Sequence, residues 1–170
     1  MNRLPPLDAR VGGARGTRRI LALLVAALLL TGCSAADAKG SADTVAKYES
    51  ALAPLKKRSD VLEKKFASVQ GARYRGPRQM RRVLATIIPQ YAELLDETRA
   101  IDVEGAELEK AQAALVASLE RQQSGLELAL RGIDREDRAM LSRAGRQLER
   151  AQALVVRHRR LLAVARRQGS

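Results

Sequence analysis

The sequence contains no tryptophan, and aromatic residues make up only 2% of its 170 residues. Strands favour aromatic and β-branched side chains, so β-sheet is not expected; alanine, leucine, glutamate, glutamine and arginine dominate, as in long helices. There is a single cysteine, so no intramolecular disulfide can form and packing must stabilise the fold. A hydrophobic content of 46% is enough to build the core of one domain.

Acidic residues are few relative to basic ones. The formal net charge is +12, and the first 32 residues contain five arginines and one aspartate. The rest of the chain holds 26 basic and 18 acidic side chains. The part beyond residue 32 is therefore basic in its own right.

The first 32 residues have the layout of an export signal, with a basic start, an apolar run and small residues. The basic residues are Arg3, Arg10, Arg15, Arg18 and Arg19. The apolar run spans residues 20–30, which is too short for a permanent transmembrane helix of about 20 residues. We therefore expect residues 1–32 to be a cleaved signal peptide.

Leu30, Thr31, Gly32 and Cys33 resemble the lipobox of bacterial lipoproteins, in which a leucine and two small residues precede a cysteine. The resemblance implies a diacylglycerol thioether on the Cys33 sulfur and cleavage between Gly32 and Cys33. It also implies acylation of the new amino group, with fatty acids such as palmitate. Two or three acyl chains, at about 0.8 kcal/mol per buried CH₂, anchor a protein stably in a membrane.

The resemblance also bears on which membrane holds the protein. In the lipoprotein family an aspartate after the cysteine tends to hold the protein in the inner membrane, whereas this chain has Ser34. The periplasmic side of the outer membrane is implied if the cell has one, and otherwise the outer face of the cytoplasmic membrane. A twin-arginine export signal is also resembled, at Thr17, Arg18 and Arg19. The leucine-rich run after them favours the general secretory route. Both routes stay open.

Beyond the signal we expect a lipidated flexible tether at residues 33–41 and a helical domain at 42–170. Apolar residues recur in the domain at steps of three and four, as on one face of a helix. Helices are predicted over about 42 to 70 and 77 to 103, from 106 to 132, and from 134 onward. Their expected buried stripes are Val45, Tyr48, Leu52, Leu55, Leu62, Phe66 and Val69; Met80, Leu84, Ile87, Tyr91, Leu94 and Ile101; Leu108, Leu115, Leu119, Leu126 and Ile133; and Leu141, Ala144, Leu148, Ala151, Val155 and Leu162.

The breaks between the helices differ in strength. Residues 71–76 interrupt the pattern, and Pro77 suits the first turn of the next helix. Gly105 is a weaker break, so whether the second and third helices are separate stays open. Gly132 is expected to end the third helix in the left-handed conformation, with Asp134 and Asp137 capping the fourth.

An antiparallel four-helix bundle buries four such one-sided helices most simply. A long helical hairpin or an oligomeric coiled coil is the alternative, because three-four spacing is also the seam pattern of supercoiled helices. The oligomeric state stays open.

The residues needed for common enzyme chemistry are lacking. The only histidine, His158, falls on the buried stripe of the fourth helix, where we expect a structural role and partial protonation near the helix C-terminus. One histidine cannot supply the two Glu-x-x-His pairs of a di-iron site, and no cysteine cluster or phosphate-cradling glycine loop is present. We expect a non-enzymatic protein without metal or cofactor.

Five arginines between the first two helices predict an anion-binding site at the end of the bundle far from the anchor, since no acid stands among them. They are Arg73, Arg75, Arg78, Arg81 and Arg82. The expected partner is an anionic cell-wall or envelope component, which would give a structural or interaction role. Tyr74 would suit stacking on a nucleic-acid base, but an exported chain argues against nucleic acid.

At the opposite end, acids of the second and third helices are expected to pair with the last arginines of the fourth. The acids are residues 93, 96, 97, 102, 104, 107 and 109, and the arginines are Arg157, Arg159, Arg160, Arg166 and Arg167. These charges are therefore expected to be neutralised, unlike the distal ones.

Pro54 and Pro89 lie inside the first two helices, where proline bends the axis. Two facing bends would open a groove lined by Leu55, Ile88 and Tyr91. Carriage of a lipid or small ligand in that groove is the alternative function.

Overall fold

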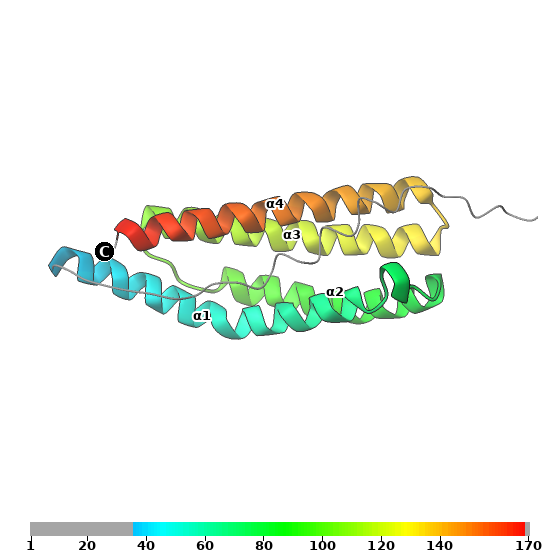
Figure 1. Ribbon diagram of the computed structural model, residues 1–170, viewed down its shortest axis with the longest axis horizontal. Helices are drawn as coiled ribbons and strands as arrows, with labels where there is room; N and C mark the ends of the chain where they lie inside the picture. Colours follow the sequence, from blue (N-terminus) through cyan, green and yellow to red (C-terminus); the bar gives the residue numbers. More distant parts are fainter. Residues whose placement is uncertain (1–35, 169–170) are drawn as a thin grey trace, which may run out of the picture. The chain divides into compact units, whose positions relative to one another are not determined.

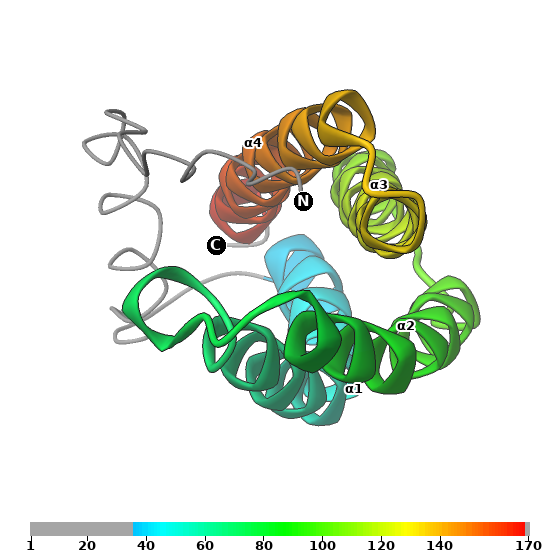
Figure 2. The same ribbon diagram turned by 90° about the vertical axis from the view of Figure 1, so that its right-hand side faces the viewer.

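The computed structural model describes residues 36–168, with side chains from residue 42 onward, and this part is all-α. Its helices are α1 (Ala36–Ala67), α2 (Pro77–Arg99), α3 (Ala106–Asp134) and α4 (Arg138–Gln168), with a short 3₁₀ helix at Gly71–Arg73. They run alternately in opposite directions (Figure 1) and form a ring when viewed end-on (Figure 2). The predicted antiparallel four-helix bundle is confirmed. The predicted signal peptide and the lipobox with Gly32 and Cys33 lie outside the described residues.

Helix α1 begins at Ala36, earlier than the expected start at residue 42. Residues 36–41 of the expected tether therefore belong to the helix. Alanine and lysine at positions 36, 38 and 39 are good helix formers, and the single Gly40 costs only about 1 kcal/mol relative to alanine.

The predicted breaks after α1 and α2 are both present. Pro77 occupies the first turn of α2, preceded by Gly76 with φ 122°. Gly105, with φ 100°, precedes the first residue of α3, so α2 and α3 are separate helices. These φ values are strained for side-chain-bearing residues, which explains why glycine stands directly before the first residue of both α2 and α3.

The prediction for Gly132 was wrong, because Gly132 lies within α3 and is buried. The left-handed residue of this turn is Glu136, with φ 53°. Asp137 caps α4, since its Oδ1 accepts a hydrogen bond of 2.9 Å from the Met140 backbone N–H. Asp134 does not take part in that cap and instead pairs with Arg81.

The main core lies between α1, α2 and α3 and contains most of the predicted stripe residues. Its buried members are Leu55, Leu62, Leu84, Ile87, Tyr91, Leu94, Leu95, Leu119 and Leu126. A smaller cluster near the α2–α3 connection joins Val45, Tyr48, Leu108 and Ala165. The predicted stripes of the first three helices are thus confirmed as core-facing, with Leu52, Phe66, Met80, Ile101, Leu115 and Ile133 only partly buried.

Helix α4 packs mainly on α3 and makes far less contact with α1. Small residues spaced seven apart form the interface, which we call the small-residue seam. It consists of Ala111, Ser118, Gly125 and Gly132 on α3 and of Ala144, Ala151, His158 and Ala165 on α4, all buried. The predicted leucine stripe of α4 was wrong at Leu141, which is 38% exposed, whereas Leu148, Val155 and Leu162 are half-buried beside the seam.

The seam is too tight for larger side chains. A Cβ atom at Gly132 would lie 2.9 Å from Leu141 Cδ2 and 3.2 Å from the Leu141 backbone nitrogen. One at Gly125 would lie 2.9 Å from Leu148 Cδ2. Glycine at these positions therefore permits the close approach of α3 and α4.

We predict that Gly132→Ala lowers the free energy of unfolding by about 1 kcal/mol, because overpacking of about 1–3 kcal/mol outweighs the gain from removing a helical glycine. Gly145→Ala on α4 is the matched control, since nothing lies within 4 Å of its added Cβ. The control should raise the free energy of unfolding by about 0.5–1 kcal/mol in denaturant titrations followed by circular dichroism. Equal stabilisation by both substitutions would contradict a tight seam.

Candidate anion-binding surface

The five predicted arginines are gathered at the α1–α2 end of the bundle, which we call the distal end. Arg73 closes the 3₁₀ helix, where its N–H donates to the Gln70 carbonyl at 3.1 Å, and the others follow on the turn and the start of α2. Arg73, Arg75, Arg78, Arg81 and Arg82 are all exposed, and Tyr74 is 49% exposed beside them. The α3–α4 turn lies at the same end (Figure 1).

One member of this cluster is neutralised. Arg81 Nε donates to Asp134 Oδ1 at 2.6 Å, which ties the start of α2 to the last residue of α3. Within residues 42–168, no carboxylate forms a salt bridge with Arg73, Arg75, Arg78 or Arg82. These four arginines, which we call the distal arginine cluster, leave a surplus of positive charge at the distal end.

The prediction for the other end of the bundle was largely wrong. Glu93 and Glu97 of α2 pair with Arg58 of α1, and Arg99 joins Asp96 and Glu120. Within residues 42–168, the salt bridge formed by α4 joins Arg166 to Glu49 of α1. Helix α2 lies next to α1 and α3 in the ring (Figure 2), and its acids pair with Arg58 of α1 or with Arg99 of α2 itself.

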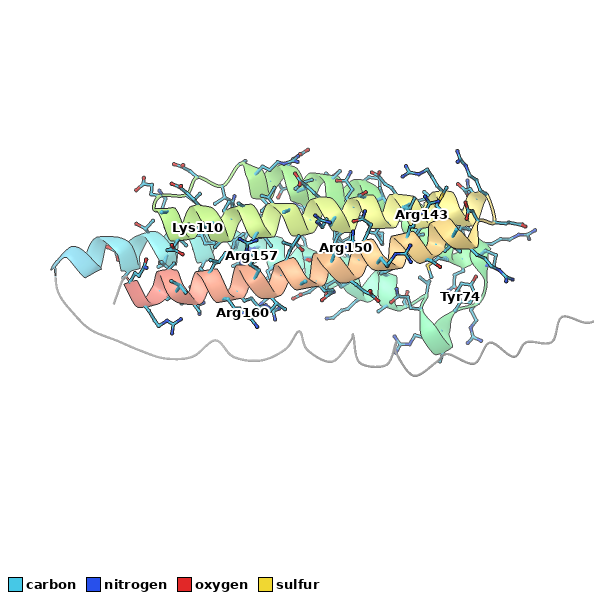
Figure 3. All side chains as sticks on the ribbon, turned by 90° about the horizontal axis from the view of Figure 1, so that it is seen from above. Tyr74, Lys110, Arg143, Arg150, Arg157 and Arg160 are labelled. Carbon is cyan, nitrogen blue, oxygen red and sulfur yellow. The ribbon has the colours of Figure 1, made fainter. Side chains whose placement is uncertain are left out.

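Sequence reasoning therefore missed a second basic surface, on α4. Arg143, Arg150 and Arg157 each stand one residue before a seam residue and are exposed. Figure 3 shows the three following one another along α4, with Lys110 of α3 near one end and Arg160 to the side. The signal was present in the sequence, since alanines and arginines both recur every seven residues there. We call Arg143, Arg150 and Arg157 the α4 arginine stripe.

Two other arginines of α4 point toward α1 and do not belong to the stripe. Arg166 Nε donates to Glu49 Oε1 at 2.8 Å. Arg159 lies close enough to Glu63 to oppose the rise in the pKa of that carboxyl, which burial causes and Asp60 increases. Arg159 and Arg166 thus complement α1, whereas the stripe faces away from it.

The buried polar groups form a structural network near the α2–α3 connection. Tyr48 Oη donates to Gln112 Oε1 at 3.0 Å, and Gln112 Nε2 donates to the Thr98 carbonyl. His158 Nδ1 donates to the Ala111 carbonyl at 2.9 Å across the seam. Each of these groups has a hydrogen-bond partner, so the arrangement stabilises the bundle.

The expected partial protonation of His158 was wrong. Burial lowers the pKa of the imidazole, more than the hydrogen bond to the Ala111 carbonyl raises it. A neutral imidazole fits its seam position, where only 7% of the residue is exposed.

The residues of the expected ligand groove are packed in the core. Leu55 and Tyr91 are buried, and Ile88 packs against the same cluster, while Pro54 and Pro89 are exposed. Two open cavities lie elsewhere, between the first turns of α1 and the α2–α3 connection. The first, of about 160 Å³, is lined by Asp43, Thr44, Lys47, Tyr48, Asp102, Val103, Glu104 and Leu108. The second, of about 290 Å³, adjoins it at Thr44, Glu104 and Leu108.

A search of the described residues finds no cluster of three or more histidine, cysteine or carboxylate side chains able to hold a metal ion. In the same part of the chain, no helix has the length and apolar character needed to cross a membrane. Comparison with family models, curated proteins and solved structures finds no match.

We predict that His158 makes the folded protein less stable as the pH falls from 7.5 to 5.5, in opposition to Glu63, whose raised pKa acts the other way. The pKa of His158 is lowered in the folded state, so below about pH 6.5 the unfolded chain binds more protons than the folded one. His158→Gln removes this linkage, and its melting temperature should fall less over the same pH range in circular dichroism. An identical pH dependence in both proteins would show that His158 does not contribute.

Proposed function

We propose that this protein is a membrane-anchored cell-envelope lipoprotein with a non-enzymatic role, binding an anionic partner of the envelope through the distal arginine cluster. The anchor is the lipid expected on Cys33. The location is the periplasmic side of the outer membrane, or the outer face of the cytoplasmic membrane where no outer membrane exists.

The single observation that carries the binding role is the unneutralised charge of the distal arginine cluster. Arg73, Arg75, Arg78 and Arg82 are exposed at the opposite end of the bundle from the start of α1. A chain anchored just before α1 would present this end away from the membrane. Guanidinium groups bind carboxylates and phosphates through paired hydrogen bonds, so an anionic wall polymer or an acidic envelope protein fits the site.

Carriage of a lipid or small ligand is the weaker proposal. Its groove would require Leu55 and Tyr91 to be accessible, and both are buried. Mass spectrometry of the purified protein would favour carriage if a lipid other than the covalent anchor were bound.

We predict that Cys33→Ala releases the protein from the membrane. Without the thioether, the acyl chains that hold the protein are absent, and the remaining electrostatic attraction is screened by salt. Membrane fractions washed at high salt should retain the wild-type protein and lose the variant. Equal retention, or a wild-type protein that keeps residues 1–32, would contradict the lipoprotein assignment.

We predict that replacing Arg73, Arg75, Arg78, Arg81 and Arg82 with glutamine weakens binding of the full chain to isolated cell-wall sacculi by about tenfold or more, because the distal positive charge is removed. Pull-down at several salt concentrations measures this. The matched control replaces five exposed lysines of α1 with glutamine, namely Lys47, Lys56, Lys57, Lys64 and Lys65.

The control carries the same loss of charge on a different surface. Binding that falls equally in both variants would mean that net charge alone is responsible. Binding that is unchanged in the arginine variant would refute the distal site.

A further inference from the structure

The basic residues of the bundle are divided between helices by type. Helix α4 contains nine arginines, no lysine and one carboxylate, Glu149. Helix α1 contains six lysines, one arginine and five acidic residues. Lysine and arginine serve solubility equally well, so a surface that is only solvated has no reason to prefer arginine. Recognition of planar or tetrahedral anions favours arginine, because a guanidinium group donates two hydrogen bonds to the same anion.

The seam determines where these arginines point. Ala144, Ala151, His158 and Ala165 face α3, so the residues one position earlier emerge at the edge of the seam, on the outer face of the α3–α4 pair. Arg143, Arg150 and Arg157 occupy those positions and are exposed (Figure 3). A seven-residue step along a helix is about 10.5 Å, so the stripe extends over about 21 Å parallel to the bundle axis.

The stripe has no internal counter-charge. Among residues with described side chains, no salt bridge involves Arg143, Arg150 or Arg157, nor Arg146 or Arg160 beside them. Glu149 forms none either. Repulsion along the row costs free energy that an external anion with several charges would offset.

We propose that the outer face of the α3–α4 pair binds a linear phosphate-bearing polymer that lies along α4, with Arg143, Arg150 and Arg157 as the principal contacts and Arg146 and Arg160 beside them. This inference rests on the proposed binding function and names the class of partner. It extends the binding surface from the distal arginine cluster onto the length of the bundle.

The geometry favours a polymer over a single anion or a membrane surface. The stripe extends over about 21 Å, so one phosphate cannot contact all three arginines at once, whereas successive phosphates of a chain reach them in turn. Insertion into a bilayer would use exposed apolar side chains, and among the described residues of α4 the only large hydrophobic ones that are exposed are Leu141 and Val156. The face is thus polar and extended, as a phosphate chain requires.

The test measures binding of the full chain, in neutral detergent, to end-labelled long-chain inorganic polyphosphate by fluorescence anisotropy. The stripe variant is Arg143→Gln, Arg150→Gln and Arg157→Gln. Its affinity should fall by about tenfold or more, and the slope of log affinity against log salt should be shallower by about 2, as expected for three lost phosphate contacts. The matched control, with Lys56, Lys57 and Lys64 changed to glutamine, should bind within about twofold of the wild type.

A third variant separates hydrogen-bond geometry from charge. Changing Arg143, Arg150 and Arg157 to lysine keeps the charge and the salt dependence but removes the paired donors, so affinity should still fall by about threefold or more. The proposal is overturned if the wild type does not bind polyphosphate or if the stripe and α1 variants lose affinity equally. Stronger binding to vesicles of anionic lipid than to polyphosphate also overturns it, in favour of a membrane surface.

The same variants distinguish failure of this inference from failure of the proposed function. Suppose that the five-arginine distal variant no longer binds sacculi but the stripe variant still binds polyphosphate with wild-type affinity; the distal site is then supported and the stripe is refuted. In the opposite case, in which the stripe variant binds polyphosphate weakly and the distal variant still binds sacculi, the stripe is supported and the distal site is refuted. Circular dichroism of each variant verifies that the bundle remains folded.

Discussion

The close approach of α3 and α4 through small side chains is the constraint on which the rest of the structure depends. A Cβ added at Gly125 or Gly132 would press against Leu148 or Leu141 of α4, and Ser118 Oγ donates a 2.9 Å hydrogen bond to the Ala151 carbonyl of the facing helix. Because α4 uses a narrow row of alanines and one histidine for this contact, most of its circumference stays outside the core. The arginines of α4 occupy that exposed part, so the tight seam and the basic outer surface have the same structural origin.

The two halves of the bundle are stabilised by different means. Helices α1, α2 and α3 share a core of leucine, isoleucine and tyrosine, which the hydrophobic effect stabilises in proportion to buried area. Helix α4 adds Leu148, Leu162 and Ala165 to these apolar clusters and is also held by dispersion contacts along the seam, by the hydrogen bond of His158 and by the pairing of Arg166 with Glu49. The surface charge differs in the same way, since most salt bridges involve α2, whereas most of the arginines without a salt bridge lie on α4 or at the distal end.

The helices, their order and most of the core could be predicted from the sequence, because large apolar residues at steps of three and four identify a buried face directly. The breaks at Gly76 and Gly105 could also be predicted, since glycine and proline act through the local backbone. The small-residue seam could not be predicted, because alanine, serine and glycine carry little hydrophobic signal. The flanking Leu141 and Leu148 instead suggested a conventional leucine stripe. Ion pairing was predicted wrongly because it depends on which helices are neighbours in the ring. The arginine periodicity becomes informative only when the adjacent alanines are known to face α3.

If the seam leaves the α4 arginines free to meet a phosphate polymer, their chemical reactivity should reveal it. Arginine-selective modification of the full chain would be quantified at each site by mass spectrometry, with and without polyphosphate. We expect Arg143, Arg150 and Arg157 to react quickly in the free protein and to be protected by polyphosphate, whereas the ion-paired Arg58 reacts slowly. Slow reaction of the three in the free protein, or protection spread evenly over all exposed arginines, would contradict it.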